Sequence, residues 1–273
     1  MLVLAAAGVL VGDQYLAPWF PCWFGCLMLM GVVAARELVR LFPPALRPSE
    51  LLTVTGVLLA LAANWHPVVR AAYAPPAPSP WALVTFVLAG VLIAAFLLEM
   101  RRYREPGPAV PRIGLTVFAV AYLGLLGSFL AQLRWVHPDA ARTSLILALT
   151  IFVPKVGDIG AFFAGTFFGR HKMTPILSPK KTWEGAAGGL LFSVLTAAGL
   201  SFVGPVFRHG VWEAVAFGAV LCCAGMLGDL AESLVKRDCA AKDAATSIPG
   251  FGGLLDVIDS VLFAAPVAYV WFG

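Results

Sequence analysis

The sequence predicts an all-α, polytopic membrane protein with about nine transmembrane helices. Hydrophobic residues make up 60% of its 273 residues, and charged residues make up only 12%. The mean hydropathy is +0.87, and the apolar runs are long enough to cross a hydrocarbon core of roughly 30 Å as helices. A transmembrane β-barrel would instead need short strands of alternating hydrophobicity. These observations exclude a soluble globular domain.

The apolar segments follow one another along the chain, and several connections between them are rich in proline. They are expected at residues 1–16, 19–41, 50–65, 81–100, 113–133, 143–168, 183–204, 211–228 and 254–272. The first segment is short for a span, and we expect it to be incomplete or re-entrant.

The segments fall into a scaffold group and a catalytic group. Charged residues of the first half, such as Glu37 and Glu99, lie at expected helix ends, where an interfacial role is the simplest interpretation. We therefore interpret residues 1–142 as a scaffold of N-terminal transmembrane helices. Residues 143–273 are interpreted as the catalytic transmembrane region of the same integral membrane unit.

The basic residues are distributed unequally between alternate connections. Most of the 19 lysine and arginine residues lie after, or at the ends of, the second, fourth, sixth and eighth segments. Because short cytoplasmic loops are enriched in Lys and Arg, this bias places those connections in the cytoplasm. We expect a multi-pass protein of a bacterial cytoplasmic (inner) membrane, with the motif loops and the active site at the cytoplasmic face.

Lys155 and Asp158 interrupt the apolar sixth segment. A charged side chain at the centre of a membrane costs about 2.5–3.5 kcal/mol on insertion scales. Two residues three positions apart on a helix can form an ion pair, which is the structural alternative. We interpret Asp158 as part of a functional cavity.

A second polar cluster opens the seventh segment and consists of Ser178, Lys180, Lys181, Thr182 and Glu184. Thr182 or Ser178 can cap the helix, and Glu184 suits its first turn. Unpaired N–H groups at a helix start, together with lysines and hydroxyl groups, favour phosphate binding. A cytoplasmic loop with a simple helix cap is the structural alternative.

The stretch from Asp229 to Asp259 concentrates acidic residues in an otherwise apolar region. The spacing of Asp229, Glu232, Ser233 and Lys236 predicts one face of a helix. Carboxylates close together repel by ~4 kcal/mol at 4 Å for an effective dielectric constant of ~20, so a cation is expected among them. Mg²⁺ prefers one or two carboxylates plus phosphate oxygens. The two clusters together indicate metal-assisted phosphoryl or nucleotidyl transfer.

These motifs resemble the phosphatidate cytidylyltransferase (CDP-diacylglycerol synthase) family. Its C-terminal signature runs Ser-x-x-Lys-Arg, Lys-Asp, Pro-Gly-His-Gly-Gly and Asp-Arg-x-Asp. The matching residues here are Ser233, Lys236, Arg237, Lys242, Asp243, Pro249, Gly250, Gly252, Gly253, Asp256 and Asp259. Residues 157–165, 178–185 and 228–233 are also similar to the family. Two positions differ, because Phe251 replaces the histidine and Val257 the arginine.

The resemblance implies transfer of CMP from CTP to phosphatidic acid, giving CDP-diacylglycerol and pyrophosphate for phospholipid biosynthesis. It implies that Asp229 and Asp256 hold Mg²⁺, with Asp259 as a third ligand or support, and it leaves a second cation open. The catalytic residues would be Asp229, Asp256, Lys236, Lys242 and Asp243. The substrate-binding residues would be Ser178, Lys180, Lys181, Thr182, Glu184, Ser233, Arg237 and Asp158. The partners would be CTP, phosphatidic acid, membrane lipids and a second copy of the chain, with no nucleic acid.

Other functions fit the residues as well. A CTP-dependent polyprenol kinase, or a cytidylyltransferase for another lipid phosphate, would use the same charged groups. An ion-coupled transporter would use Lys155, Asp158 and the other carboxylates as an ion path.

Overall fold

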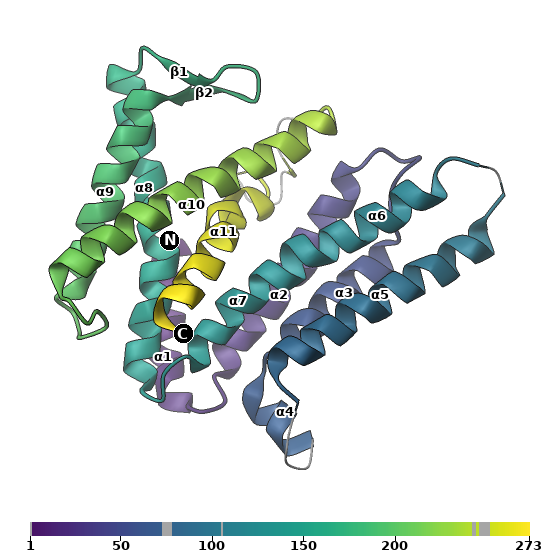
Figure 1. The fold of residues 1–273 in the computed structure, drawn as a ribbon, viewed down its shortest axis with the longest axis horizontal. Helices are drawn as coiled ribbons and strands as arrows, with labels where there is room; N and C mark the ends of the chain where they lie inside the picture. The colour runs from purple at the N-terminus through teal and green to yellow at the C-terminus, as the bar shows by residue number, and fades with distance from the viewer. Residues whose placement is uncertain (1, 73–77, 105, 242–243, 246–251) are drawn as a thin grey trace. The chain divides into compact units, whose positions relative to one another are not determined.

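The computed structural model describes residues 2–72, 78–104, 106–241, 244–245 and 252–273. Helices dominate these ranges, which confirms the predicted all-α class, and a two-stranded hairpin accompanies them (Figure 1). The chain forms two compact units. Unit 1 comprises Met1–Ala17, Leu133–Asp238 and Ile258–Gly273, and unit 2 comprises Pro18–Gln132 and Cys239–Val257.

Unit 2 is a set of helices that lie alongside one another, with α3 packed on α2, α5 and α6. Its elements are α2 (Pro21–Leu41), α3 (Glu50–Ala62), α4 (His66–Ala72), α5 (Pro80–Arg102), α6 (Ala109–Val120), η2 (Ala121–Leu125) and α7 (Leu126–Gln132). Asn64 follows α3 and is fully buried. Its side-chain amide donates to the Ala60 carbonyl at 2.7 Å and to Ser128 Oγ at 2.9 Å. These bonds satisfy polar groups at the point where the helix ends.

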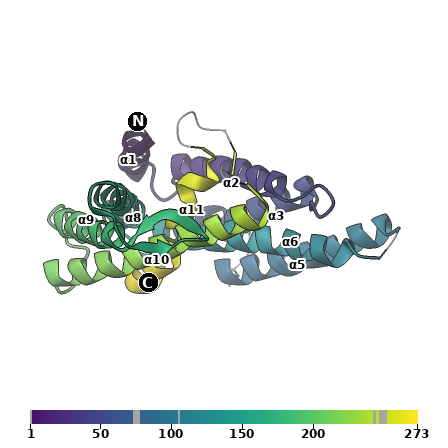
Figure 2. The same cartoon turned by 90° about the horizontal axis from the view of Figure 1, so that it is seen from above.

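Unit 1 is built around two long helices, α8 and α9, which run side by side and are joined by the hairpin (Figures 1 and 2). Its elements are α1 (Leu2–Asp13), η1 (Gln14–Leu16), η3 (Leu133–Trp135), α8 (Ala140–Phe168), β1 (Lys172–Thr174), β2 (Ser178–Thr182), α9 (Trp183–Ser201), α10 (Val211–Asp238) and most of α11 (Leu255–Phe272). A Cβ at Gly160 would lie 2.6 Å from the Phe192 ring. Gly160 of α8 therefore allows α9 to approach closely.

Seven helices are long and apolar enough to cross a membrane, or eight if the bent pair α3–α4 is one span. The sequence predicted about nine, so within the described residues the expected number is not reached. The first segment is the α1 helix of 12 residues, which is too short. The third segment bends by 87° between α3 and α4.

Two local predictions concern the helices that carry the candidate site. Thr182 caps α9, since its Oγ1 accepts the Gly185 N–H at 3.1 Å. The predicted cap is therefore confirmed. The eighth apolar segment was expected to end at residue 228, with a helical face from Asp229 to Lys236 after it, and α10 includes both and continues to Asp238. The end of the apolar run marked only the end of the hydrophobic part, because a helix continues as long as its backbone is hydrogen-bonded.

Candidate active site

Carboxylates from three helices of unit 1 pair with lysines in one cluster, two of them with Lys155 and one with Lys181. Asp158 and Lys155 lie on α8, Asp229 on α10 and Asp259 on α11. Lys155 Nζ lies 3.1 Å from Asp158 Oδ2 and 3.4 Å from Asp259 Oδ1. Ser260 Oγ donates to Asp158 Oδ2 at 3.3 Å. Lys155 thus joins α8 to α11 at the level of the carboxylates.

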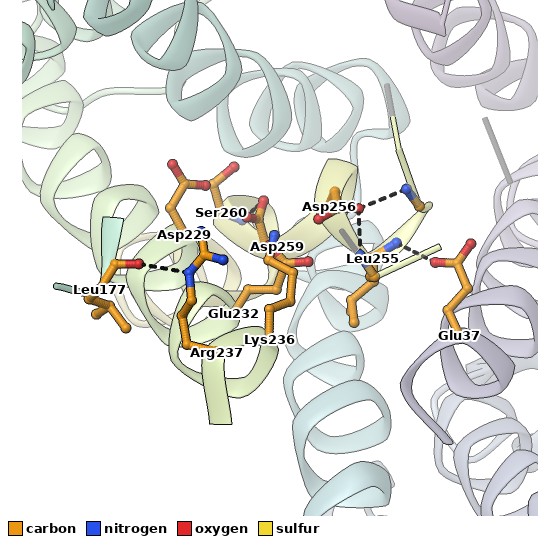
Figure 3. Close-up of polar contacts among 12 residues, drawn as sticks. Glu37, Leu177, Asp229, Glu232, Lys236, Arg237, Leu255, Asp256, Asp259 and Ser260 are labelled. Carbon is orange, nitrogen blue, oxygen red and sulfur yellow. Dashed lines mark hydrogen bonds and ion pairs between the residues drawn. The ribbon is translucent and has the colours of Figure 1, made fainter. Parts of the chain in front are cut away.

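Asp229 and Asp259 face one another in this cluster (Figure 3). Lys181, which lies on strand β2, places its Nζ 3.1 Å from Asp229 Oδ2. The backbone N–H of Ser260 donates to Asp259 Oδ1 at 2.6 Å. The structure therefore brings together Asp158, Asp229, Asp259 and Lys181, which were predicted from separate motifs.

The charges of this cluster do not balance. Three carboxylates meet two ammonium groups, and the Asp259 side chain is only 5% exposed. Asp229 pairs with Lys181, and Asp158 and Asp259 share Lys155, so the carboxylates exceed the ammonium groups by one charge. The oxygen donors fit a hard cation such as Mg²⁺. Within the part of the chain that the structure describes, no group of three or more His, Cys, Asp or Glu side chains is arranged to hold a metal ion.

A glycine next to Asp229 permits the close contact between α10 and α11. A Cβ at Gly228 would lie 2.5 Å from the carbonyl oxygen of Asp259 and 3.0 Å from the Cα of Ser260. Both neighbours are backbone atoms, so no side-chain rotation could relieve the contact. Gly228 thus sets the separation at which the two carboxylates face one another.

The last turns of α10 carry the other predicted residues of this helix. Asp229, Glu232, Ser233 and Lys236 share a helix, as predicted. Lys236 Nζ lies 2.8 Å from Glu232 Oε2, and both side chains are largely buried. Arg237 Nε donates to the Leu177 carbonyl at 3.4 Å, which attaches the hairpin to α10 (Figure 3). The predicted phosphate-binding roles of the two basic residues stay predictions.

The polar cluster before α9 forms part of the hairpin. Ser178, Lys180 and Lys181 lie on β2, and the sequence did not predict a strand there. Glu184 accepts the backbone N–H groups of Arg170 and His171 at 3.1 and 3.2 Å, and it lies 2.6 Å from His171 Nδ1. Its carboxylate therefore stabilises the turn between α8 and β1. Its proposed contact with substrate stays a prediction.

A separate polar network lies in unit 2 at the start of α11. Asp256 Oδ2 accepts the N–H groups of Gly253 at 2.7 Å and Ala244 at 3.2 Å. Glu37 on α2 accepts the N–H groups of Leu254 at 3.0 Å and Leu255 at 2.8 Å (Figure 3). These bonds satisfy the free N–H groups of a helix start.

The glycines of the signature fit this network. Gly252 has a φ of 89°, which a residue with a side chain rarely adopts. A Cβ at this position would also lie 2.8 Å from Asp256 Oδ2. The Gly-Gly pair therefore leaves room for the carboxylate of Asp256 beside the backbone.

Sequence reasoning missed two residues. Glu37 was interpreted as an interfacial residue, but it is only 4% exposed and binds the backbone of α11. A glutamate within an apolar segment was the available signal. Lys155 was recognised as an intramembrane charge but not assigned to the site. Lys242, Asp243 and Phe251 lie outside the described residues.

Comparison with known proteins identifies related sequences. A sequence model of the cytidylyltransferase family matches residues 1–273. A phosphatidate cytidylyltransferase of Mycobacterium leprae is 37% identical over 158 residues, which cover 56% of this chain and 47% of the relative. A protein of the same name from Brucella suis is 33% identical over 201 residues, which cover 70% of this chain and 71% of the relative. A protein of the same name from Synechocystis is 32% identical over 213 residues, which cover 67% of this chain and 69% of the relative.

The match therefore spans about half the length of the mycobacterial relative and about seven-tenths of the other two. The helices of membrane-spanning length and the family of these relatives together identify the protein as an integral, multi-pass membrane protein. The family match covers the whole chain, including the three motifs that place carboxylates and lysines in the structure. The chain belongs to the cytidylyltransferase family.

Proposed function

We propose that the protein is a phosphatidate cytidylyltransferase, which transfers CMP from CTP to phosphatidic acid and releases pyrophosphate. The observation that carries this proposal is the cluster of Asp158, Asp229 and Asp259 with Lys155 and Lys181. It combines surplus negative charge for a cation with a lysine that is suited to phosphate. The names of the relatives agree with this reaction.

The proposed reaction requires positioning more than proton transfer. An oxygen of the lipid phosphate forms a bond to the α-phosphorus of CTP, and the bond from that phosphorus to the bridging oxygen of the β-phosphate breaks. The nucleophile is already an anion, so no strong general base is needed. When bound, Mg²⁺ would neutralise charge on the triphosphate and the leaving pyrophosphate. The sequence resemblance assigns this ion to Asp229 and Asp256, with Asp259 in support.

Lys181 has a specific part in this proposal. Its ammonium group pairs with Asp229 at 3.1 Å. The triphosphate carries more negative charge than one carboxylate and would compete for the ammonium group. Asp229 would then be available to a cation while Lys181 contacts phosphate. Lys155, held between Asp158 and Asp259, would keep these two carboxylates in place.

The location of the site and the assembly of the protein are part of the same proposal. The bias of basic residues supports motif loops on the cytoplasmic side of a bacterial inner membrane. The lipid substrate would enter sideways from the bilayer, because its acyl chains must stay in an apolar environment. A homodimer is expected from the family resemblance.

A product assay tests the proposed function. Purified protein in detergent receives radiolabelled CTP or ATP, Mg²⁺, and either phosphatidic acid or polyprenol. We expect a CDP-lipid and pyrophosphate with CTP and phosphatidic acid only, and no product after chelation of the metal. Release of CDP with a phosphorylated polyprenol would replace the proposal with a CTP-dependent kinase. Absence of any nucleotide-dependent product would contradict both.

Gly228→Ala tests whether helix contact positions the carboxylates. The added methyl group would force α10 away from the backbone of α11, and a displacement of about 1 Å at a reacting group can lower a rate about a hundredfold. We expect a rate of CDP-lipid formation at least about tenfold lower. Gly199→Ala is the matched control, because a Cβ there meets no atom within 4 Å. Equal activity of the two variants would show that this contact does not position the site.

A further inference from the structure

The β1–β2 hairpin of unit 1 presents an apolar side chain at its tip. Ile176 lies in the turn between Lys172–Thr174 and Ser178–Thr182, and it is 95% exposed. The adjacent Pro175 is also exposed. An exposed apolar loop tip gains free energy if it moves from water into an apolar phase.

The charge of the hairpin is positive, which favours an anionic partner. Residues 169–182 contain no acidic residue, whereas Arg170, Lys172 and Lys180 are basic and exposed. Lys181 is the one lysine of the hairpin for which an ion pair within the chain is described, with Asp229. An apolar tip flanked by basic side chains is the chemistry that binds an anionic lipid surface.

The hairpin lies between two helices of membrane-spanning length, where a lipid surface is expected. It joins the end of α8 to the start of α9, and both helices have the length and composition of membrane spans. Aromatic side chains lie exposed at both junctions, with Phe167 73% and Trp183 60% exposed. Tryptophan at the end of a membrane span is typical of the membrane–water interface. Arg237 at the end of α10 holds the Leu177 carbonyl, so the tip is attached to a third span-length helix.

We propose that the tip of the β1–β2 hairpin, Pro175 and Ile176, inserts into the headgroup region of the bilayer and that Arg170 and Lys172 bind anionic lipids beside it. The partner is the lipid surface itself. The hairpin is then held from two sides, by Arg237 on α10 and by lipid at its tip. This contact does not depend on the reaction that the protein catalyses.

Site-specific fluorescence quenching tests the proposal. The five native cysteines are replaced, and Ile176→Cys carries an environment-sensitive fluorophore. The full chain is reconstituted in phosphatidylcholine vesicles with or without phosphatidylglycerol, and lipids that carry a shallow doxyl group act as quenchers. With anionic lipid we expect quenching at least about threefold stronger than for the control Asp238→Cys. Asp238 is an exposed acidic residue at the end of α10.

Charge variants separate the lipid interaction from simple exposure. Arg170→Gln with Lys172→Gln should lower the quenching at position 176 to the level found without phosphatidylglycerol. Pro175→Cys provides a second labelled position if Ile176→Cys does not fold. Quenching no stronger at positions 175 and 176 than at 238 would overturn the proposal. Blue-shifted emission that the lipid quencher does not reduce would also overturn it, because a protein surface would then cover the tip.

Discussion

Asp229→Asn is expected to lower the rate of CDP-lipid formation by at least about a thousandfold, since charged groups at a reacting phosphate contribute several kcal/mol. Asparagine has nearly the same shape but no negative charge. It would lose the ion pair with Lys181 at 3.1 Å and could no longer neutralise a divalent cation. The measurement is radiolabelled lipid product formed from CTP at saturating Mg²⁺.

Asp238→Asn is the matched control for this variant. Asp238 is exposed in the last turn of the same helix, so its replacement should leave the rate unchanged. Both variants should insert into the membrane and elute from size-exclusion chromatography as the parent protein does. Near-normal turnover of Asp229→Asn at saturating Mg²⁺ would show that this carboxylate is neither a metal ligand nor a neutralising group.

Glu37→Ala should give the second largest effect, although Glu37 lies far from the motifs in the sequence. The substitution leaves the N–H groups of Leu254 and Leu255 without their acceptor. An unsatisfied buried donor costs about 1–3 kcal/mol, and Glu37 is itself buried. We expect the turn that holds Asp256 to loosen. The maximal rate should fall by at least about thirtyfold, and the melting temperature should also fall.

Glu37→Gln distinguishes positioning from a general loss of stability. Glutamine keeps one carbonyl oxygen as acceptor and should restore the melting temperature more completely than the maximal rate. The apparent affinity for Mg²⁺ should be weakened in both variants, because Asp256 is an expected ligand. Glu50→Ala is the control, since the ion pairs of Glu50 with Arg36 and Arg40 are exposed. If Glu37→Ala behaves like Glu50→Ala, Glu37 has no positioning role.

Local signals allowed several elements to be predicted. The apolar segment at 81–100 corresponds to α5, which runs from Pro80 to Arg102. The N-cap at Thr182 and the shared helix of Asp229 to Lys236 were likewise predicted. Each of these features depends on residues within a few turns of one another, so spacing and residue type are sufficient.

Features that depend on contacts between distant segments could not be predicted from local spacing and residue type. The hairpin at Lys172–Thr182 depends on pairing across a short turn between two helices, and its residues show no strand alternation. The spacing of Asp229 to Lys236 predicted a helix, but it did not show that this helix is continuous with the apolar segment before it in α10. The pairing of Lys155 with Asp259 joins residues that are far apart in the chain.

The sequence by itself determined that this chain is a helical membrane protein, because hydropathy is a local property. It also identified the polar residues that are candidates for the site, because motif spacing is local as well. Only the tertiary structure decided which of these residues meet. Lys155 joins Asp158 to Asp259, Lys181 pairs with Asp229, and Glu37 binds the start of α11. Such pairs form because a charge or a free N–H group away from water must find a partner. Helix packing determines which partner lies within reach.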